Sequence, residues 1–145
     1  MSFPAPAPGL VVRYSYLWAD DAAEGHEEGD KDRPAAIVMA TLDTARGDTC
    51  AYVLAITHSA PQKGQAALEI PADVARRAGL DAGRHWVILD EFNNFVWPGF
   101  DLRHVPNKTP STVAYGVLTP GFFNNVRNAW LALDAARRTT PVPRD

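Results

Sequence analysis

Six short runs rich in β-branched and aromatic residues recur along the chain, a composition typical of β-strands. Turn-like clusters separate most of them, and residues 58–65 are expected to form a loop. Residues 46–48, between the second and third runs, form a link short enough to predict an antiparallel hairpin. The six runs read GLVVRYSYLW, AAIVMATL, CAYVLAI, ALEI, WVILD and FVW.

Two helices are predicted from different signals. Residues 71–80 carry Pro71 near a helix start and Gly79 just past its end, which favours a short helix. In the last helix, Thr119 is the expected N-cap and Pro120 the first helical residue, followed by apolar residues at spacings of four, seven, eight and eleven. These are Phe122, Val126, Ala129, Trp130 and Leu133.

Many strands with few helices favour a mainly β, α+β fold: a small, strongly bent antiparallel sheet or barrel, with the terminal helix over an open end or edge. At 145 residues, we expect a single domain over residues 1–145. A hydrophobic fraction of 46% and a charged fraction of 21% exclude a disordered chain or a coiled coil. No apolar run reaches the ~18 residues of a membrane helix and the first residues show no secretory signal, so we expect a cytoplasmic protein without membrane contact.

Charge is distributed unevenly. The chain has 14 basic and 17 acidic residues, a net charge of −3, which does not favour a broad nucleic-acid-binding surface. Seven of the acidic and two of the basic residues fall between Asp20 and Arg33, which leaves twelve basic against ten acidic residues elsewhere. We expect a flexible acidic loop at about residues 18–32 because Gly25 and Gly29 interrupt it, with local order on binding.

Most familiar enzyme and metal motifs are missing from the sequence. Four histidines, at positions 26, 58, 85 and 104, lie too far apart for a local ligand pair. A single cysteine, Cys50, excludes the usual structural zinc sets and an internal disulfide. There is no Walker or Rossmann glycine loop and no nucleophile elbow. The sequence therefore predicts neither a metal site nor a cofactor.

Arg33 is a candidate anion-binding residue. It lies directly before Pro34 and an apolar strand, next to the acidic loop. A planar guanidinium donates to two oxygens of one phosphate and stabilises charge that develops there, which lysine does less specifically. Alternatively, Arg33 forms a salt bridge with a nearby carboxylate, that of Glu28, Asp30 or Asp32.

Polar residues also follow two other strands. Thr57 and His58 end CAYVLAI, where a hydroxyl could hold a phosphoryl oxygen and an imidazole could move a proton. Alternatively, Thr57 caps a turn and His58 is an ordinary exposed histidine. Of Asp90 and Glu91, one carboxylate can face the same edge as Thr57 and act as a base, or both are solvated turn residues.

Three segments carry a resemblance when they are read in order and at their separations: GHEEGDKDRPAAIVMA, YVLAITHS and WVILDEFNNFVW. They resemble the MazF/PemK family of toxins from bacterial toxin–antitoxin systems, over most of the chain. In that family a G-x-E…G-x-R-P loop leads into a hydrophobic strand, a later strand ends in a threonine-containing motif, and an Asp-Gln pair and a C-terminal helix follow. Thr57 and Asp90 match that pattern, and Arg33 and Pro34 lie one residue further on than in it. His58 stands where serine or threonine is usual, and Glu91 replaces the glutamine.

The resemblance implies a five-stranded or larger SH3-like antiparallel barrel that forms a homodimer and is neutralised by an acidic antitoxin. It also implies a growth inhibitor, often serving plasmid maintenance, that cleaves single-stranded RNA without metal, by attack of a 2′-hydroxyl on the adjacent phosphorus. Arg33 would then clamp the phosphate, Thr57 would donate a hydrogen bond, and Asp90 or His26 would be the base. The expected substrate-binding residues are Glu27, His58, Ser59 and Glu91.

Two departures keep other functions open. PemK-type members carry an arginine where this chain has Ile88, and the acidic loop repels RNA. These departures favour a non-enzymatic SH3-like barrel that binds a protein, as a retired toxin or a regulator. A third possibility is a gyrase poison like the similarly folded CcdB. Phe95 and Trp97, likewise, either stack on unpaired bases or pack in the core.

Overall fold

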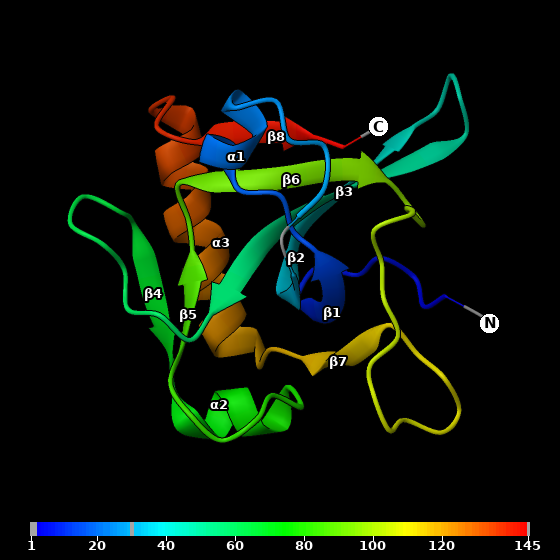
Figure 1. Cartoon of the computed structure of the whole chain (residues 1–145), viewed down its shortest axis with the longest axis vertical. Coiled ribbons are helices and arrows are strands. Elements are labelled where there is room, and N and C mark those ends of the chain that lie inside the picture. The colour runs from blue at the N-terminus through cyan, green and yellow to red at the C-terminus, as the bar shows by residue number, and fades with distance from the viewer. Residues whose placement is uncertain (1–2, 30, 145) are drawn as a thin grey trace.

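The computed structural model describes residues 3–29 and 31–144, which form eight strands and three helices (Figure 1). The helices are α1 (Ala19–Ala23), α2 (Ala72–Arg77) and α3 (Pro120–Ala135). The strands are β1 (Leu10–Ser15), β2 (Asp32–Asp43), β3 (Asp48–Thr57), β4 (Ala67–Ile70), β5 (His85–Ile88), β6 (Glu91–Val96), β7 (Ala114–Val117) and β8 (Thr140–Pro143).

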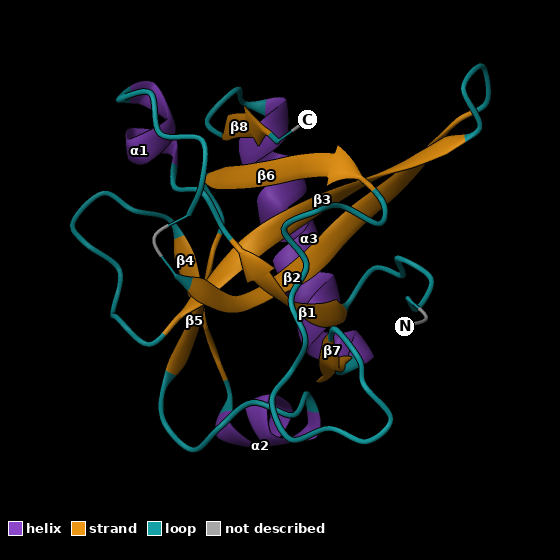
Figure 2. Ribbon diagram, turned by 45° about the vertical axis from the view of Figure 1, so that its right-hand side comes forward, coloured by secondary structure: helices purple, strands orange, loops and turns teal. Residues whose placement is uncertain are grey.

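All eight strands belong to one sheet with a main order of β4-β5-β3-β2-β1-β7. The predicted β2–β3 hairpin is confirmed, and every pairing is antiparallel except that of β8 with β6. Within the described ranges no pairing joins β4 to β7, so the sheet does not close into a barrel (Figure 2). The mainly β, α+β class is confirmed, and the expectation of a closed barrel is corrected to an open sheet.

The sheet divides along β3. Residues 50–53 pair with β6, whereas Ile56 and Thr57 pair with β5. Strands β5 and β6 are consecutive, and only Leu89 and Asp90 separate them. Two strands therefore share one side of β3, and residues 89–90 join them between the part of β3 that ends at Val53 and the part that begins at Ile56.

Both faces of the central strands are covered, which explains why their sequences are almost continuously apolar rather than alternating. Along β1, Val11 belongs to the hydrophobic cluster on the α3 side, whereas Val12 and Tyr14 belong to the cluster on the other face. Ile56 and Ala55 of β3 divide in the same way. This period-two alternation between two buried clusters fixes the register of the strands.

Helix α3 packs on one of these clusters, as predicted. Val126 and Trp130 are buried in it, and the rest of the apolar stripe is partly buried against the same core. Thr119 occupies the N-cap position with extended backbone, although its side chain makes no capping hydrogen bond. Among the described helices, none combines the length and apolar character needed to cross a bilayer.

Two glycines allow a close backbone contact between α2 and β7. Gly79 ends the α2 segment with φ +80°, a conformation that side chains rarely adopt, and a Cβ there would collide with the carbonyl of Tyr115. A Cβ on Gly116 would lie 2.7 Å from the carbonyl oxygen of Ala78. The contact is reciprocal, so a methyl group on either side would force the two segments apart.

Three elements were not predicted. The acidic segment contains the short helix α1, where the sequence predicted a flexible loop. Its first residue, Ala19, donates its backbone N–H to Glu91 Oε1, so a contact with β6 holds the helix start. The other two are β7 and β8, at opposite edges of the sheet.

Candidate functional site

The register of the β2–β3 hairpin places Arg33 beside Thr57. Ala35 pairs with Ala55 in antiparallel register, so two residues further along Arg33 lies across from Thr57. Glu91 begins β6 at the point where that strand diverges from β5. Three polar side chains from distant parts of the sequence thus come to neighbouring parts of the sheet.

These side chains line one cavity of about 340 Å³. Its walls come from the chain around α1, the start of β2, the end of β3 with the loop after it, and the start of β6. Two cations, two carboxylates, two hydroxyls and two amides are among the lining side chains. They are Lys31 and Arg33, Asp20 and Glu91, Thr57 and Ser59, and Gln62 and Gln65, together with Trp18, Ala60 and Ile88.

Trp18 supports the Arg33 side chain. The guanidinium lies over the indole ring, 4.9 Å from its centroid, and Arg33 is only 9% exposed. Of the carboxylates predicted as alternative partners, Asp32 pairs with Arg13 at 3.7 Å and with Arg103 at 3.6 Å. Glu28 lines a different cavity, and Asp30 lies outside the described residues. Stacking on a wide ring holds the planar guanidinium in a fixed orientation.

Glu91 is a half-buried carboxylate with a fixed position. Its Oε1 accepts hydrogen bonds from the backbone N–H of Ala19 at 2.9 Å and from the Tyr16 hydroxyl at 3.2 Å. Burial raises the pKa of Glu91, and the nearby carboxylates of Asp90 and Asp20 raise that pKa further, against the effect of the two hydrogen bonds. A carboxyl whose pKa moves towards neutrality is suited to accept and release a proton.

Thr57 caps a turn, which was one of the two roles expected for it. Its Oγ1 accepts the backbone N–H of Ser59 at 3.1 Å and so shapes the start of the loop after β3. The hydroxyl hydrogen remains a donor in this arrangement because the oxygen acts as the acceptor. Thr57 can therefore shape the turn and face the cavity at once.

Asp90 does not line this cavity. Its Oδ2 accepts the backbone N–H of Ala66 at 3.1 Å, and its carbonyl accepts the N–H of Thr140 at 3.0 Å. The carboxylate thus organises the segment before β4. Of the two consecutive acids, Glu91 rather than Asp90 is the one beside Arg33 and Thr57.

His26 and Glu27 lie in a second, larger cavity of about 780 Å³ between the acidic segment and β8. Phe100, which is fully exposed, and Asp101 form part of the same wall. His26 and Glu27 are therefore not brought together with Arg33.

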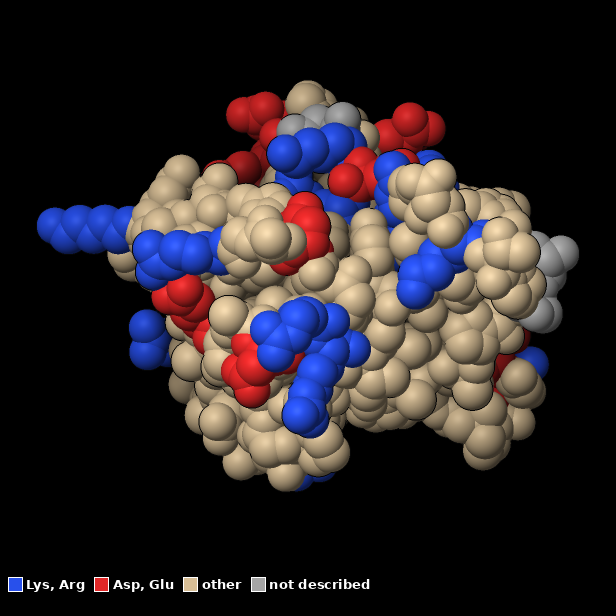
Figure 3. Space-filling model, turned by 90° about the horizontal axis from the view of Figure 1, so that it is seen from below, with Lys and Arg blue, Asp and Glu red and all other residues tan. Residues whose placement is uncertain are grey.

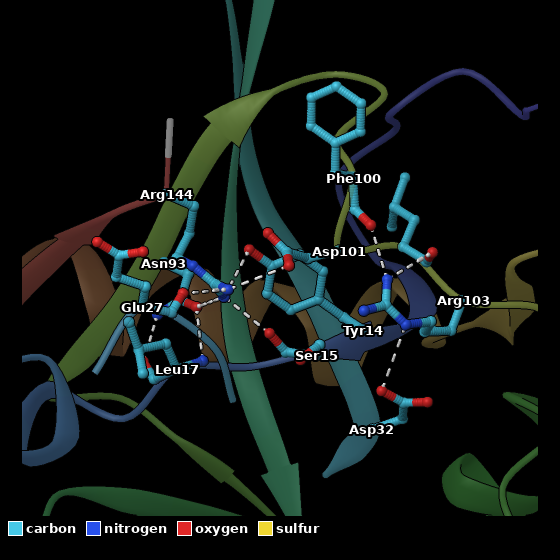
Figure 4. A network of polar contacts seen from close by, with 11 residues as sticks. Tyr14, Ser15, Leu17, Glu27, Asp32, Asn93, Phe100, Asp101, Arg103 and Arg144 are labelled. Carbon is cyan, nitrogen blue, oxygen red and sulfur yellow. Dashed lines mark hydrogen bonds and ion pairs between the residues drawn. The ribbon is translucent and has the colours of Figure 1, made fainter. Parts of the chain in front are cut away.

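Arg144 is the cation of the larger cavity, and its contacts are structural (Figure 4). Its side chain is 2% exposed and forms an ion pair with Asp101 at 3.1 Å. Its guanidinium also donates to the Ser15 carbonyl at 2.7 Å and to Asn93 Oδ1 at 3.0 Å. A cation with so many fixed partners has little capacity to bind a ligand, so the smaller cavity is the better candidate site.

His58 lies beyond Thr57, on the other side of the strand end. It lines two further cavities, one of which, of about 210 Å³, also borders Arg33, Thr57 and Ser59. Its Nδ1 lies 3.0 Å from the Arg84 carbonyl and its Nε2 lies 3.4 Å from Asp81 Oδ1. His58 is therefore an exposed histidine whose two ring nitrogens both lie close to polar atoms of other residues.

The two aromatic residues proposed to stack on bases have structural contacts. Phe95 is buried and stacks on Tyr14, with ring centroids 5.0 Å apart. The indole N–H of Trp97 donates to the Pro4 carbonyl at 3.0 Å. Trp18 is the aromatic residue that reaches the candidate site, and the sequence indicated it only as the end of a strand run.

The surface has no broad basic region on the face seen from the α2 side, where basic and acidic groups alternate (Figure 3). Lys31 and Arg33 are the cations that line the candidate site, beside the carboxylates of Asp20 and Glu91. Gln62 and Gln65 were also missed by the sequence reasoning. A turn brings them together, because Gln65 Oε1 accepts the N–H of Gln62 at 3.1 Å.

Comparisons with family models, with curated proteins and with solved structures found no match for this chain.

Proposed function

We propose that the cavity around Arg33, Thr57 and Glu91 binds the phosphodiester backbone of single-stranded RNA and cleaves it without metal. The observation that carries the proposal is the meeting of a stacked arginine, hydroxyl donors and a carboxyl with a raised pKa in one cavity. Cleavage through a 2′-hydroxyl needs these groups: a proton acceptor, and donors for the charge that builds up on the phosphoryl oxygens.

In the proposed reaction, the 2′-oxygen attacks the adjacent phosphorus while its proton passes to Glu91. Both hydrogen bonds to Glu91 use Oε1, so Oε2 is the oxygen that receives the proton. Arg33 and Thr57 donate to the phosphoryl oxygens. The bond from phosphorus to the 5′-oxygen breaks, and that oxygen takes a proton from a solvent water, while the hydroxide so formed takes up the proton held by Glu91. The products are a 2′,3′-cyclic phosphate and a free 5′-hydroxyl.

The resemblance of the sequence to the MazF/PemK family suggests the wider biological role. The protein would be a MazF/PemK-like toxin with an SH3-like arrangement of strands, active as a homodimer and neutralised by an antitoxin. Glu91 takes the role that the resemblance gave to Asp90 or His26, because neither of those residues lines the cavity. Expression without the antitoxin should then arrest growth.

Incubation of purified protein with mixed RNA in EDTA tests the proposal. We expect discrete fragments ending in 2′,3′-cyclic phosphate, and no cleavage where the attacking nucleotide carries a 2′-deoxy substitution. Arg33→Ala should abolish both cleavage and growth arrest while the protein stays folded. Arg46→Ala is the matched control, since Arg46 is exposed in the β2–β3 turn. Intact RNA with the wild-type protein would contradict the proposal.

A protein-binding module without catalytic activity is the second candidate. One observation favours it: Ile88, at the position where PemK-type members carry an arginine, lines the cavity. The cavity then has one cation fewer for the phosphoryl group. RNA binding without cleavage, or no interaction with RNA at all, would support this second function over the first.

A further inference from the structure

Three potential metal ligands meet near the end of β3. His58 follows β3, His85 is the first residue of β5, and Asp81 lies in the loop between α2 and β5. The ligand atoms of the three residues all lie within 4.8 Å of one another. The sequence predicted no metal site because its histidines are far apart along the chain, and strand pairing overcomes that separation.

The pairing of β3 with β5 produces this arrangement. Thr57 pairs with Trp86 in antiparallel register, so the next position brings His58 across from His85. The two imidazole rings lie 4.4 Å apart, centroid to centroid. Because a sheet register is fixed by its buried face, the two rings are held together by the fold and do not meet by chance.

The distances match those of a metal-binding site. Asp81 Oδ1 lies 3.4 Å from His58 Nε2 and 3.2 Å from His85 Nε2. In a tetrahedral zinc site, with metal–ligand distances near 2.1 Å, neighbouring ligand atoms are roughly 3.4 Å apart. Two edges of the tetrahedron are thus already formed, and small rotations of the exposed His58 and Asp81 side chains would complete the third.

The tautomer of His58 favours the same conclusion. Its Nδ1 lies 3.0 Å from the Arg84 carbonyl oxygen, which can only accept, so Nδ1 carries a hydrogen, and Nε2, on the side of Asp81, is the nitrogen that can bind a metal ion. Metal-binding histidines are commonly oriented by this kind of bond to a backbone carbonyl. His85 is 2% exposed, and its Nε2 lies 3.1 Å from the Asp81 carbonyl. When a metal ion binds this nitrogen, the neutral imidazole would carry its hydrogen on Nδ1 instead.

The surroundings leave room for a cation. Arg84 is turned to Glu69, with two contacts of 2.8 Å, and stacks on Trp86. Gly83 has φ +139°, and a Cβ there would lie 3.5 Å from the His58 ring, so a glycine lets the loop pass close to the imidazole. An adjoining cavity of about 330 Å³ reaches the three ligands, and Lys108 is the positive charge on its wall.

We propose that His58, Asp81 and His85 bind one divalent transition-metal ion, with an open coordination position towards the adjoining cavity. Two imidazoles and one carboxylate suit Zn²⁺, and three protein ligands with an open position are typical of zinc that binds water or a ligand. None of the three ligands lines the cavity of about 340 Å³ around Arg33, although His58 borders a smaller cavity together with Arg33 and Thr57. Metal binding does not depend on RNA cleavage.

Calorimetric titration of the EDTA-treated full chain with Zn²⁺ tests the proposal, in the absence of RNA. We expect one ion per chain, and visible absorption typical of tetrahedral coordination when Co²⁺ is used instead. His58→Gln and Asp81→Asn, both at exposed positions, should each weaken Zn²⁺ binding at least tenfold, because loss of even an outer-shell partner of a ligand costs about 10- to 100-fold. His104→Gln is the matched control, an exposed histidine outside the cluster, and should bind as the wild type does.

His85→Gln replaces the buried ligand, so circular dichroism must first show that this variant is folded. A folded His85→Gln protein should also lose affinity and the Co²⁺ spectrum. The proposal is overturned if the wild-type protein does not bind Zn²⁺, or if His58→Gln and Asp81→Asn bind as tightly as His104→Gln. RNA cleavage in EDTA is measured separately, so failure of one proposal leaves the other standing.

Discussion

The Arg33 guanidinium lies over the Trp18 ring, 4.9 Å from its centroid, at the wall of a polar cavity. Trp18 precedes α1 and Arg33 follows the start of β2, so the two residues hold both ends of the acidic segment at the site. A guanidinium contacts an aromatic ring with its face and donates hydrogen bonds from its edge, so the contact of Arg33 with Trp18 is compatible with donation to phosphate oxygens.

Arg33→Lys should reduce RNA cleavage by about 100-fold or more, because lysine keeps the charge but loses the planar set of donors. Trp18→Leu should reduce it less, by roughly 2- to 30-fold, the equivalent of one cation–π contact. Single-turnover cleavage rates measure both effects. An Arg46→Lys control should cleave at the wild-type rate, and equal rates in Arg33→Lys would show that Arg33 does not contact the phosphate.

RNA affinity should depend only moderately on salt. Two cations, Lys31 and Arg33, line the cavity, and each phosphate contact with a single strand contributes about −0.7 to the slope of log affinity against log salt. The expected slope is therefore roughly −1.4, and Arg33→Ala should reduce its magnitude by about 0.7. Fluorescence anisotropy with a labelled, 2′-deoxy-blocked RNA gives the slope. A value several times steeper would place the RNA on a wider surface than this cavity.

Glu91→Gln should change how stability depends on pH. The folded pKa of Glu91 is raised above its ordinary value of 4.5, so between those two values the native state holds a proton that the unfolded state has lost. The wild-type protein therefore loses stability as pH rises through that window, and Glu91→Gln does not. Urea unfolding at a series of pH values should show the variant gaining stability relative to the wild type as pH rises.

Glu69→Gln supplies a control of opposite sign. The hydrogen bonds from Arg84 lower the pKa of Glu69, so the wild-type protein gains stability there as pH rises. Glu69→Gln should thus lose stability relative to the wild type over its own, more acidic window. Parallel curves for Glu91→Gln and the wild type would mean that Glu91 titrates alike in the folded and unfolded states.

Gly79→Ala should destabilise the protein by more than about 2 kcal/mol, because the substitution adds a left-handed strain to the collision with the Tyr115 carbonyl. Gly116→Ala has only the collision and should cost about 1–3 kcal/mol. Gly121→Ala, in α3, meets open space and should change stability by about 0 to 1 kcal/mol in the favourable direction. Chemical denaturation measures all three, and similar values for Gly79→Ala and Gly121→Ala would contradict the close contact.

Arg144→Met should cost roughly 3–5 kcal/mol, since it removes a buried cation and leaves the Asp101 carboxylate and the Asn93 amide without that donor. Arg46→Met, which breaks an exposed pair with Asp48, should cost at most about 1 kcal/mol. Asp101→Asn in the Arg144→Met background should recover part of the loss. Thermal unfolding followed by circular dichroism distinguishes these outcomes.

The central strands and α3 could be predicted because their signals are local. In β1 to β3 the apolar runs supply both hydrophobic clusters, and in α3 Val126 and Trp130 recur on one face. Strand β8 gave no such signal, because Pro141 and Pro143 disfavour a strand except at an edge, where β8 pairs with β6 alone. Helix α1 has five residues, too few for a helical period, and contacts with other elements hold it.

The candidate site was predictable to the extent that it depends on one hairpin. Arg33 and Thr57 are neighbours across β2 and β3, and a hairpin register follows from its short turn. Whether Asp90 or Glu91 faces them depends on the divergence of β5 from β6, which no local pattern shows. The pairing of β3 with β5, which brings His58 close to His85, spans β4, α2 and the loops beside them, so no local pattern indicates it either.

The Arg144 contacts also have a consequence for biosynthesis. The ribosome adds this residue after Ser15, Asn93 and Asp101, and after β6, the strand on which β8 forms. In a nascent chain the β2–β3 hairpin and α3 can form earlier, whereas the ion pair between Asp101 and Arg144 can form only after translation has passed position 144. Nascent chains that stall before that point would lack the Arg144 contacts and should be preferred substrates for quality-control proteases.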